Sequence, residues 1–395
     1  MLPNGWKEIE YGDLFSLTSG KTKPSDISAT AELDKDIPVY GGNGILGYTD
    51  KPLVQNPNFI IGRVGEYCGT IRYVNSPSWI TDNALYAKEM LEDIDLKFLT
   101  YKLEYFDLSK LRKKGGQPLV SQEPIYKAKD KIPTSKVEQQ KIAKILSTWD
   151  EAIEKLGRLI QEKKKRQDEL TYNLLRGVRR FPEFTKTSVT LKNGLQEGWE
   201  IKKLGDIAEI KGGKRIPKGY ALKTEKTEYP YIRVTDFEAG SVSLKQILYM
   251  DKHIYEQIKN YTINEDDIYI SVAGTLGLVG RIPKELSGAN LTENANKITS
   301  IKIDKDYLLY FLQSSYIQKE IESIKTTNAQ PKLALTRIRD FSIHIPSLVE
   351  QQKISKLISN SEKEIILLEK CRASRIKQKQ GLMQILLTGK RRVHV

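Results

Sequence analysis

The stretch Glu138-Gln139-Gln140-Lys141-Ile142 opens a long amphipathic segment and decides how this chain folds. The same five residues return as Glu350-Gln351-Gln352-Lys353-Ile354, a shift of 350 − 138 = 212 residues. The segments ahead of them also match, since Gly5-Trp6 corresponds to Gly198-Trp199 at a shift of 198 − 5 = 193 residues. A period of about 200 residues is far too long for a solenoid. The sequence therefore predicts two copies of one unit, each a domain followed by a long helix.

The two long segments carry apolar residues at the spacing of a coiled coil. From Ile142 to Ile160 the apolar positions advance by 4, 3, 4, 3 and 4 residues, which is the 3.5-residue period of an a/d seam. Both seams are apolar at their ends and polar in the middle. The apolar seam positions are Ile142, Leu146, Trp149, Ile153, Leu156, Ile160, Leu170 and Leu174 in the first segment, and Ile354, Ile358, Ile365, Leu368, Leu382 and Leu386 in the second.

Start and stop signals place these helices at residues 136–180 and 349–390. Ser135 stands three residues ahead of Glu138, and Ser347 three ahead of Glu350, which is the pattern of a capping box. A glycine closes each segment where a helix C-terminus belongs. We expect the two helices to pack on each other, antiparallel and related by a pseudo-two-fold axis. The alternative is that each helix packs only on its own domain.

The domains themselves, residues 1–135 and 198–348, show the punctuation of mixed α+β folds. Short apolar runs such as Phe59-Ile60-Ile61 end at glycine, proline or asparagine, which favours strands and turns. Residues 96–106 carry leucines at helical spacing, and residues 307–312 repeat this in the second domain. The remaining parts are a linker over 181–197 and a basic tail over 391–395.

Length and composition set the class of protein. The 395 residues allow roughly two to three domains, each with its own core. Two unrelated cysteines, Cys68 and Cys371, and three scattered histidines argue against a disulfide framework and a structural zinc site. No apolar run reaches the ~18 residues of a membrane span, and the first residues do not resemble a signal peptide. We expect a cytoplasmic protein that uses no membrane and no metal.

The positive charge is concentrated on the helical segments. The whole chain carries a net +14. Residues 136–180 contribute 12 − 7 = +5 and residues 349–395 contribute 11 − 4 = +7. Such an excess points to nucleic acid or to an acidic partner. The plainer interpretation, a solvated helix face, explains such a run equally well.

No catalytic constellation is recognisable in the sequence. Gly41-Gly42-Asn43-Gly44 lacks the downstream lysine of a phosphate-binding loop and is better explained as a turn. Asn56-Pro57-Asn58-Phe59 differs at its third position from the Asn-Pro-Pro-Phe signature of amino-methyltransferases. The scarcity of histidine and cysteine argues against nucleophile and triad chemistry. We therefore expect a protein that recognises rather than catalyses.

Glycine-flanked loops in both domains carry side chains that suit DNA. Arg forks onto guanine and Asn or Gln onto adenine, whereas Lys mostly meets phosphate. The candidate DNA-binding residues are Lys21, Lys23, Asn43, Arg63, Lys113, Lys114 and Gln117 in the first domain, and Lys214, Arg215, Arg233, Thr275, Asn294, Lys325 and Gln330 in the second. Each loop alone fits an ordinary surface turn better. Because such loops recur at corresponding places in both domains, DNA binding and an ordinary surface turn explain them equally well.

Taken in order, these motifs resemble the specificity subunits of type I restriction–modification systems over nearly the whole chain. Any one motif is weak, but all of them in order, twice, are specific. The segments that carry the resemblance are Gly5-Trp6 with Gly12-Asp13-Leu14, Ile132-Pro133 with Glu138 to Ala143, Leu174-Leu175-Arg176-Gly177, and their second copies at Gly198-Trp199 with Gly205-Asp206-Ile207, Ile345-Pro346 with Glu350, and Leu382 to Lys390.

The resemblance implies two target-recognition domains, each reading half of a bipartite sequence in double-stranded DNA. It implies that the paired helices hold these domains at a fixed separation and dock methyltransferase subunits. S-adenosylmethionine is then expected on the methyltransferase subunits, and ATP and magnesium on a restriction motor subunit, with no cofactor on this chain. Two alternatives stay open: a coiled-coil scaffold with two protein-binding heads, and an enzyme that acts on DNA alone.

Overall fold

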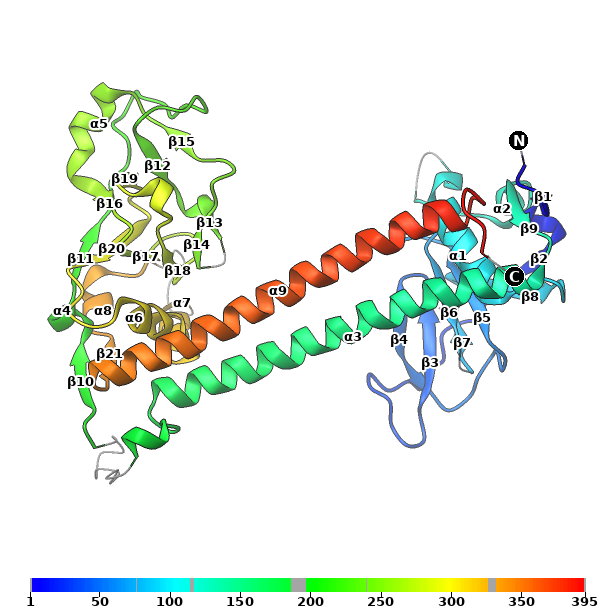
Figure 1. Ribbon diagram of the computed structural model, residues 1–395, viewed down its shortest axis with the longest axis horizontal. Coiled ribbons are helices and arrows are strands. Elements are labelled where there is room, and N and C mark those ends of the chain that lie inside the picture. Colours follow the sequence, from blue (N-terminus) through cyan, green and yellow to red (C-terminus); the bar gives the residue numbers. More distant parts are fainter. Residues whose placement is uncertain are drawn as a thin grey trace. The chain divides into compact units, whose positions relative to one another are not determined.

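The computed structural model describes residues 2–75, 77–113, 117–185, 197–238, 240–325 and 332–393. The chain forms two compact units: unit 1 comprises Met1–Leu159 with Leu368–Val395, and unit 2 comprises Ile160–Leu367. Both long helices, α3 (Lys136–Leu175) and α9 (Leu348–Leu386), contribute residues to both units. Figure 1 shows each of them as one uninterrupted helix.

The domain of unit 1 is built on two small sheets and a two-stranded ladder. One sheet has the order β2-β8-β5-β6, the second has the order β4-β3-β7, and β1 pairs with β9. Its elements are β1 (Trp6–Glu10), η1 (Tyr11–Asp13), β2 (Phe15–Ser19), β3 (Ile37–Gly41), β4 (Gly44–Thr49), β5 (Asn58–Gly62), β6 (Ile71–Val74), β7 (Trp79–Ile80), β8 (Ala84–Met90), α1 (Leu96–Phe106), η2 (Leu108–Leu111), α2 (Gln122–Tyr126) and β9 (Lys129–Pro133).

Helix α1 covers the four-stranded sheet of unit 1 beside β5 and β6 (Figure 1). It spans the residues predicted from its leucine spacing, so that prediction is confirmed. The carboxylate of Asp95 caps its N-terminus by accepting a 2.8 Å hydrogen bond from the amide of Phe98. Its apolar face and the central strand β5 bury Leu99, Leu103 and Phe59 in one core.

Unit 2 repeats this topology with more elements. Its sheets have the orders β11-β20-β17-β18 and β15-β12-β19-β16, β10 pairs with β21, and β13 with β14. Its elements are η3 (Pro182–Phe184), β10 (Glu200–Lys203), α4 (Leu204–Ile207), β11 (Glu209–Gly212), β12 (Pro230–Ile232), η4 (Val234–Asp236), β13 (Phe237–Glu238), β14 (Ser241–Val242), β15 (Leu248–Tyr249), α5 (Lys252–Ile258), η5 (Lys259–Tyr261), β16 (Thr262–Ile263), β17 (Ile268–Ser271), β18 (Val279–Arg281), η6 (Lys284–Leu286), β19 (Ala289–Leu291), β20 (Ala295–Thr299), α6 (Lys305–Gln313), α7 (Ser315–Lys325), α8 (Leu335–Arg339) and β21 (Ser342–Ile345).

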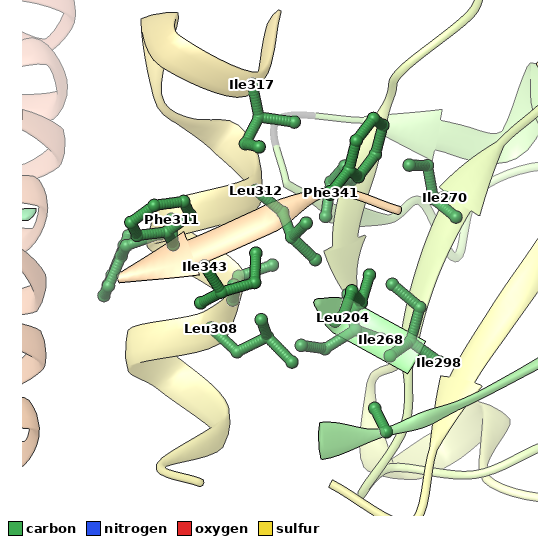
Figure 2. Packing of buried hydrophobic residues seen from close by; sticks show 14 of the residues in the cluster. Leu204, Ile268, Ile270, Ile298, Leu308, Phe311, Leu312, Ile317, Phe341 and Ile343 are labelled. Atoms are coloured by element: carbon green, nitrogen blue, oxygen red, sulfur yellow. The ribbon is translucent and has the colours of Figure 1, made fainter. Parts of the chain in front are cut away.

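The core of unit 2 forms between α6 and the sheet. Figure 2 shows Leu308 and Leu312 of α6 on the side of the helix that faces Ile268 and Ile298 of the sheet. All four side chains are fully buried. Fully burying one leucine or isoleucine contributes roughly 1.5–3 kcal/mol, so this layer is a principal source of the unit's stability.

The long helices contact each other within each unit, and their directions are antiparallel. In unit 1, Asp150 of α3 pairs with Lys379 of α9 at 2.7 Å, and Glu138 near the start of α3 pairs with Arg392 beyond the end of α9. In unit 2, Lys163 pairs with Glu364 at 2.6 Å. The alternative in which each helix packs only on its own domain is therefore wrong.

The apolar residues of the predicted seam are all buried or half-buried. In the polar middle of the α9 seam, by contrast, Arg372 and Arg375 are exposed. Ile142 and Leu146 share a cluster with Met383 and Leu386 in unit 1, and Leu174 shares one with Ile354 and Ile358 in unit 2. The helices end at Leu175 and Leu386, earlier than predicted, and Gly177 and Gly389 follow with positive φ values of 69° and 70°.

In each predicted capping box the role of the serine is confirmed and that of the glutamate side chain is wrong. Ser135 does accept from the amide of Glu138 at 3.4 Å, and Ser347 from that of Glu350 at 3.3 Å. The glutamate side chains, however, bind arginines. The carboxylate of Glu138 accepts hydrogen bonds of 2.5 and 2.6 Å from Arg392. A buried carboxylate gains more from a guanidinium fork than from the neutral N–H that a capping box offers.

Candidate nucleic-acid interface

Loops from four parts of unit 1 join at one end of the sheet β2-β8-β5-β6. The amide of Lys21 donates to the carbonyl of Ile80 at 3.0 Å, and the amide of Arg63 donates to the carbonyl of Asn83 at 2.9 Å. Val120 in turn donates to the carbonyl of Arg63 at 2.9 Å. These backbone bonds fix the loops whatever side chains they carry.

Close packing at glycine makes this junction possible. A Cβ atom at Gly20 would lie 2.1 Å from the carbonyl oxygen of Ile80, and one at Gly62 would lie 2.5 Å from that of Gly42. Only glycine permits such an approach between backbones. The glycines that flank the predicted DNA-binding residues therefore have a structural reason.

The junction brings together several of the predicted DNA-binding residues of unit 1. Lys21 and Arg63 are on the joined loops, and Asn43 is on the turn between β3 and β4. The backbone amide of Lys113 donates to the carbonyl of Leu119 at 3.0 Å. Lys21, Asn43, Lys113, Gln117 and Lys23 are exposed. Lys23 lies two residues beyond the bridge between Lys21 and Thr81, and none of the backbone bonds above ties it to the junction.

The side chain of Arg63 is held in place at this junction by a hydrogen bond. It is half-buried, and its guanidinium donates to the hydroxyl of Ser19 at 3.0 Å. An arginine that is positioned in this way loses less side-chain entropy when it binds a base or phosphate. Its remaining N–H groups suit the acceptor edge of guanine or a phosphate oxygen.

Unit 2 has the same backbone junction. The amide of Lys214 donates to the carbonyl of Leu291 at 2.8 Å, and the amide of Val272 donates to the carbonyl of Asn294 at 2.8 Å. Leu333 donates to the carbonyl of Val272 at 3.0 Å. A Cβ atom at Gly213 would lie 2.1 Å from the carbonyl of Thr292, as at Gly20. By these bonds Lys214 corresponds to Lys21, Asn294 to Asn83 and Val272 to Arg63.

The side chains on this shared junction differ between the units. Val272 replaces the cation Arg63, and Arg215 forms an ion pair of 2.5 Å with Glu293. Although burial opposes it, the hydrogen bond from Arg215 lowers the pKa of Glu293. Thr275 is exposed, and its carbonyl accepts from the hydroxyl of Ser271 at 2.5 Å.

Arg233 has intramolecular partners. Its guanidinium donates to Asp236 at 3.0 and 2.6 Å and to the carbonyl of Gln246 at 2.9 Å, and the hydrogen bonds to Asp236 raise the pKa of Arg233. The structure therefore shows Arg233 bracing a loop. Of the other predicted residues, Lys114 and Gln330 lie outside the described residues, as does the side chain of Lys325.

Sequence reasoning missed the residues that join the helices to the domains. The side-chain amide of Gln139 donates to the carbonyl of Pro133 and accepts from the backbone N–H of Asp95. The side-chain amide of Gln351 does the same with Pro346 and Asp304. The hydroxyl of Tyr101 donates to Asp150 at 2.6 Å. Its counterpart Tyr310 donates to Glu362 at 2.7 Å. A signal was present, because these residues also match between the two repeats.

Two absences hold for the described part of the chain. It contains no group of three or more His, Cys, Asp or Glu side chains that could hold a metal ion. Among the helices described, none is long and apolar enough to cross a membrane.

Comparison with known proteins identifies the family. The family model for the type I restriction modification DNA specificity domain matches residues 3–163 and 196–378. The chain is 24% identical to the MjaVIII specificity subunit of Methanocaldococcus jannaschii, over 99% of this chain and 94% of that protein. It is 27% identical to the putative MjaX specificity subunit of the same organism, over 83% and 76% of the two chains.

Solved structures show the same fold. The crystal structure of the type I restriction–modification S subunit from M. genitalium matches with a TM-score of 0.65 at 21% identity, over 98% of this chain and 99% of that one. A chain from a structure that describes complex assembly and conformational transition of the type I R-M system matches with a TM-score of 0.56 at 14% identity, over 98% of both chains. The chain therefore belongs to the type I restriction–modification DNA specificity subunits and carries the specificity domain twice.

Proposed function

We propose that each unit reads one half of a gapped, bipartite DNA sequence, and that this chain itself catalyses no reaction. One observation carries the proposal: the same backbone junction, with the same hydrogen bonds, displays different side chains in the two units. A cation, Arg63, stands in unit 1 where Val272 stands in unit 2. Because base identity is read by side chains rather than by backbone position, two unlike half-sites follow.

The contacts with DNA are assigned to the exposed side chains of each junction. In unit 1 these are Lys21, Asn43, Lys113 and Gln117, together with the positioned Arg63. In unit 2 the corresponding candidates are Lys214, Arg215 and Thr275. The lysines then contribute mostly phosphate contacts, which orient the domain. The side-chain amides of Asn43 and Gln117, and the guanidinium of Arg63, contribute base contacts.

The long helices α3 and α9 set the gap between the half-sites and dock methyltransferase subunits. Support comes from the basic excess on these segments and from the antiparallel contacts between them. Partner subunits then supply the chemistry, with S-adenosylmethionine on the methyltransferase subunits and ATP and magnesium on a restriction motor subunit. The complex would act in the cytoplasm, where the cell's DNA is found.

The test maps DNA methylation by the chain together with its methyltransferase partner. An asymmetric motif with two defined halves and an unread gap is the expected result. A companion gel-shift with random duplex at decreasing salt should show affinity that rises steeply as salt falls. Methylation that depends on one contiguous sequence would contradict the proposal, and binding to no DNA at any salt would favour the scaffold.

A further inference from the structure

The hairpin of β3 and β4 in unit 1 carries two exposed aliphatic residues beside its turn. The side chains of Ile45 and Leu46 are 49% and 47% exposed. Leu46 packs across the hairpin, since its Cδ1 atom lies 2.9 Å from the place that a Cβ atom would take at Gly41. Adjacent side chains of a strand point to opposite faces, so Ile45 does not share this contact. Neither hydrophobic core of unit 1, as far as the structure describes it, includes Ile45.

Backbone contacts join this hairpin to the DNA-binding junction of unit 1. The amide of Thr81 donates to the carbonyl of Tyr40 at 2.9 Å, and Tyr40 lies opposite Ile45 in the ladder between β3 and β4. At the turn, a Cβ atom at Gly42 would lie 2.9 Å from the carbonyl oxygen of Asn83, the same oxygen that accepts from the amide of Arg63. Ile45 is therefore directly across the ladder from a residue of the junction.

An arginine flanks the turn of this hairpin. The Nη1 atom of Arg72 in β6 lies 3.1 Å from the place that a Cβ atom would take at Gly44, whose φ of 144° also favours glycine. Arg72 is half-buried, and no hydrogen bond or ion pair to a described residue holds its guanidinium. A cation beside an exposed aliphatic side chain matches DNA, which offers phosphates and, in the major groove, the methyl group of thymine.

The corresponding place in unit 2 is filled by backbone. Arg72 pairs with Ile60 of β5, and Gly280 pairs with Tyr269 of β17. Ile60 and Tyr269 correspond, because each stands three residues before the junction residue of its strand. A Cβ atom at Gly280 would lie 2.4 Å from the carbonyl oxygen of Gly240, so a side chain like that of Arg72 has no room there. The combination of aliphatic side chain and free guanidinium is thus a property of unit 1.

We propose that Ile45 reads a thymine in the half-site of unit 1 by packing against its C5-methyl group. Asn43, which is exposed two residues earlier, suits the adenine of the same base pair through its side-chain amide. Arg72 contacts a phosphate and holds the hairpin close to the groove. The inference rests on the proposed reading of DNA, and it adds an A·T pair that unit 1 requires.

The test measures the binding of the chain, together with its methyltransferase partner, to a duplex that carries the mapped motif. The half-site of unit 1 is the one that changes when residues 1–135 are exchanged. Each thymine of this half-site is replaced in turn by uracil, which lacks only the methyl group. At one position the native chain should bind about fourfold more weakly, the effect of one methyl group withdrawn from an apolar contact. In Ile45→Ala the same replacement should have no effect.

Two controls show whether the effect belongs to Ile45. Leu91→Ala removes a side chain of equal exposure, 50%, just beyond the end of β8 that lies away from the junction, and it should keep the fourfold loss. Uracil in the half-site of unit 2 should affect the native chain and Ile45→Ala alike. Circular dichroism checks that both variants are folded.

Three results would overturn the inference and leave the bipartite motif standing. They are a half-site of unit 1 that contains no A·T pair, equal binding of thymine and uracil by the native chain at every position, and a uracil effect in Ile45→Ala as large as in the native chain. A chain for which no gapped motif can be mapped would refute the proposed function, and this inference with it.

Discussion

The guanidinium of Arg180 donates hydrogen bonds of 2.9 and 2.8 Å to the carboxylate of Glu350. The arginine follows the helix of the first repeat, and the glutamate opens the helix of the second. Arg392 and Glu138 repeat the relationship in unit 1, with the roles of the repeats exchanged. Each arginine also donates to the carbonyl that precedes a Gly-Trp pair, at Glu197 and at Asn4. Each unit thus contains an ion pair that joins a residue of the first repeat to a residue of the second.

Replacing Arg180 by alanine should destabilise unit 2 strongly. The Glu350 side chain is only 1% exposed and that of Arg180 8% exposed, so the substitution leaves a buried carboxylate without its cation. Breaking a buried pair in this way costs about 3–5 kcal/mol. Urea unfolding of the variant measures the loss, and the exposed neighbour Arg179→Ala is the matched control.

The equivalent substitution in unit 1 should cost less. The side chain of Arg392 is 41% exposed, so water can partly replace it at Glu138. Equal losses for Arg392→Ala and Arg180→Ala would show that burial does not decide the strength of these pairs.

Replacing Gly213 by alanine should damage the backbone junction of unit 2. Its Cβ would lie 2.1 Å from the carbonyl of Thr292, and backbone cannot yield as a flexible side chain does. Overpacking of this kind costs about 1–3 kcal/mol. The neighbour Gly212→Ala is the control, since its Cβ would meet only the Asn296 side chain at 3.6 Å. Thermal unfolding compares the two variants, and equal transition temperatures would count against a close-packed junction.

The stability of unit 2 should fall as the pH drops below about 6.5, the ordinary pKa of histidine. Burial, with a contribution from Arg176, lowers the pKa of His344 in the folded chain. The unfolded chain therefore takes up a proton first, so stability rises with pH through the window below 6.5 and is fully present above it. Unfolding of the native chain and His344→Gln across this range measures the difference.

His253, which is exposed, offers the control for that experiment. His253→Gln should leave the pH dependence as it is in the native chain. A native chain whose stability changes with pH in the same way as that of His344→Gln would exclude the imidazole as the cause.

Local patterns in the sequence predicted much of the fold. The leucine spacing predicted the bounds of α1, because this helix buries one face. The apolar run Phe59 to Ile61 predicted the central strand β5, because this strand is buried along that run. The a/d spacing likewise located the helix contacts. These features depend on neighbours within one or two turns, which a single sequence displays.

The site was less predictable, because nonlocal bonds assemble it. Nothing in the spacing of Lys21, Asn43, Arg63 and Gln117 says that the loops join at one sheet end. Long-range backbone bonds such as Arg63 to Asn83 do that. The hydrogen bonds between Arg233 and Asp236 did have a local signal, because the carboxylate stands three residues after the arginine in the sequence.

Exchanging residues 1–135 for the corresponding domain of another specificity subunit should change one half of the methylated motif. The reciprocal exchange of residues 198–348 is the control and should change the other half. The physical reason is that each unit displays its own side chains on its own backbone junction. Methylation mapping of both chimaeras measures the result, and a change in both halves from one exchange would contradict independent reading.

Removing seven residues from both long helices should shorten the gap between the half-sites and leave each half intact. Lys163 pairs with Glu364, so residues 161–167 of α3 lie level with residues 361–367 of α9, and removing both keeps the contacts in register. Seven residues span ~10 Å of helix, which corresponds to about three base pairs at ~3.4 Å each. Methylation mapping with the partner subunit measures the gap. A control chain with both stretches replaced at equal length, seam positions kept, should retain the original gap; a deleted chain that also retained it would show that the helices do not set the spacing.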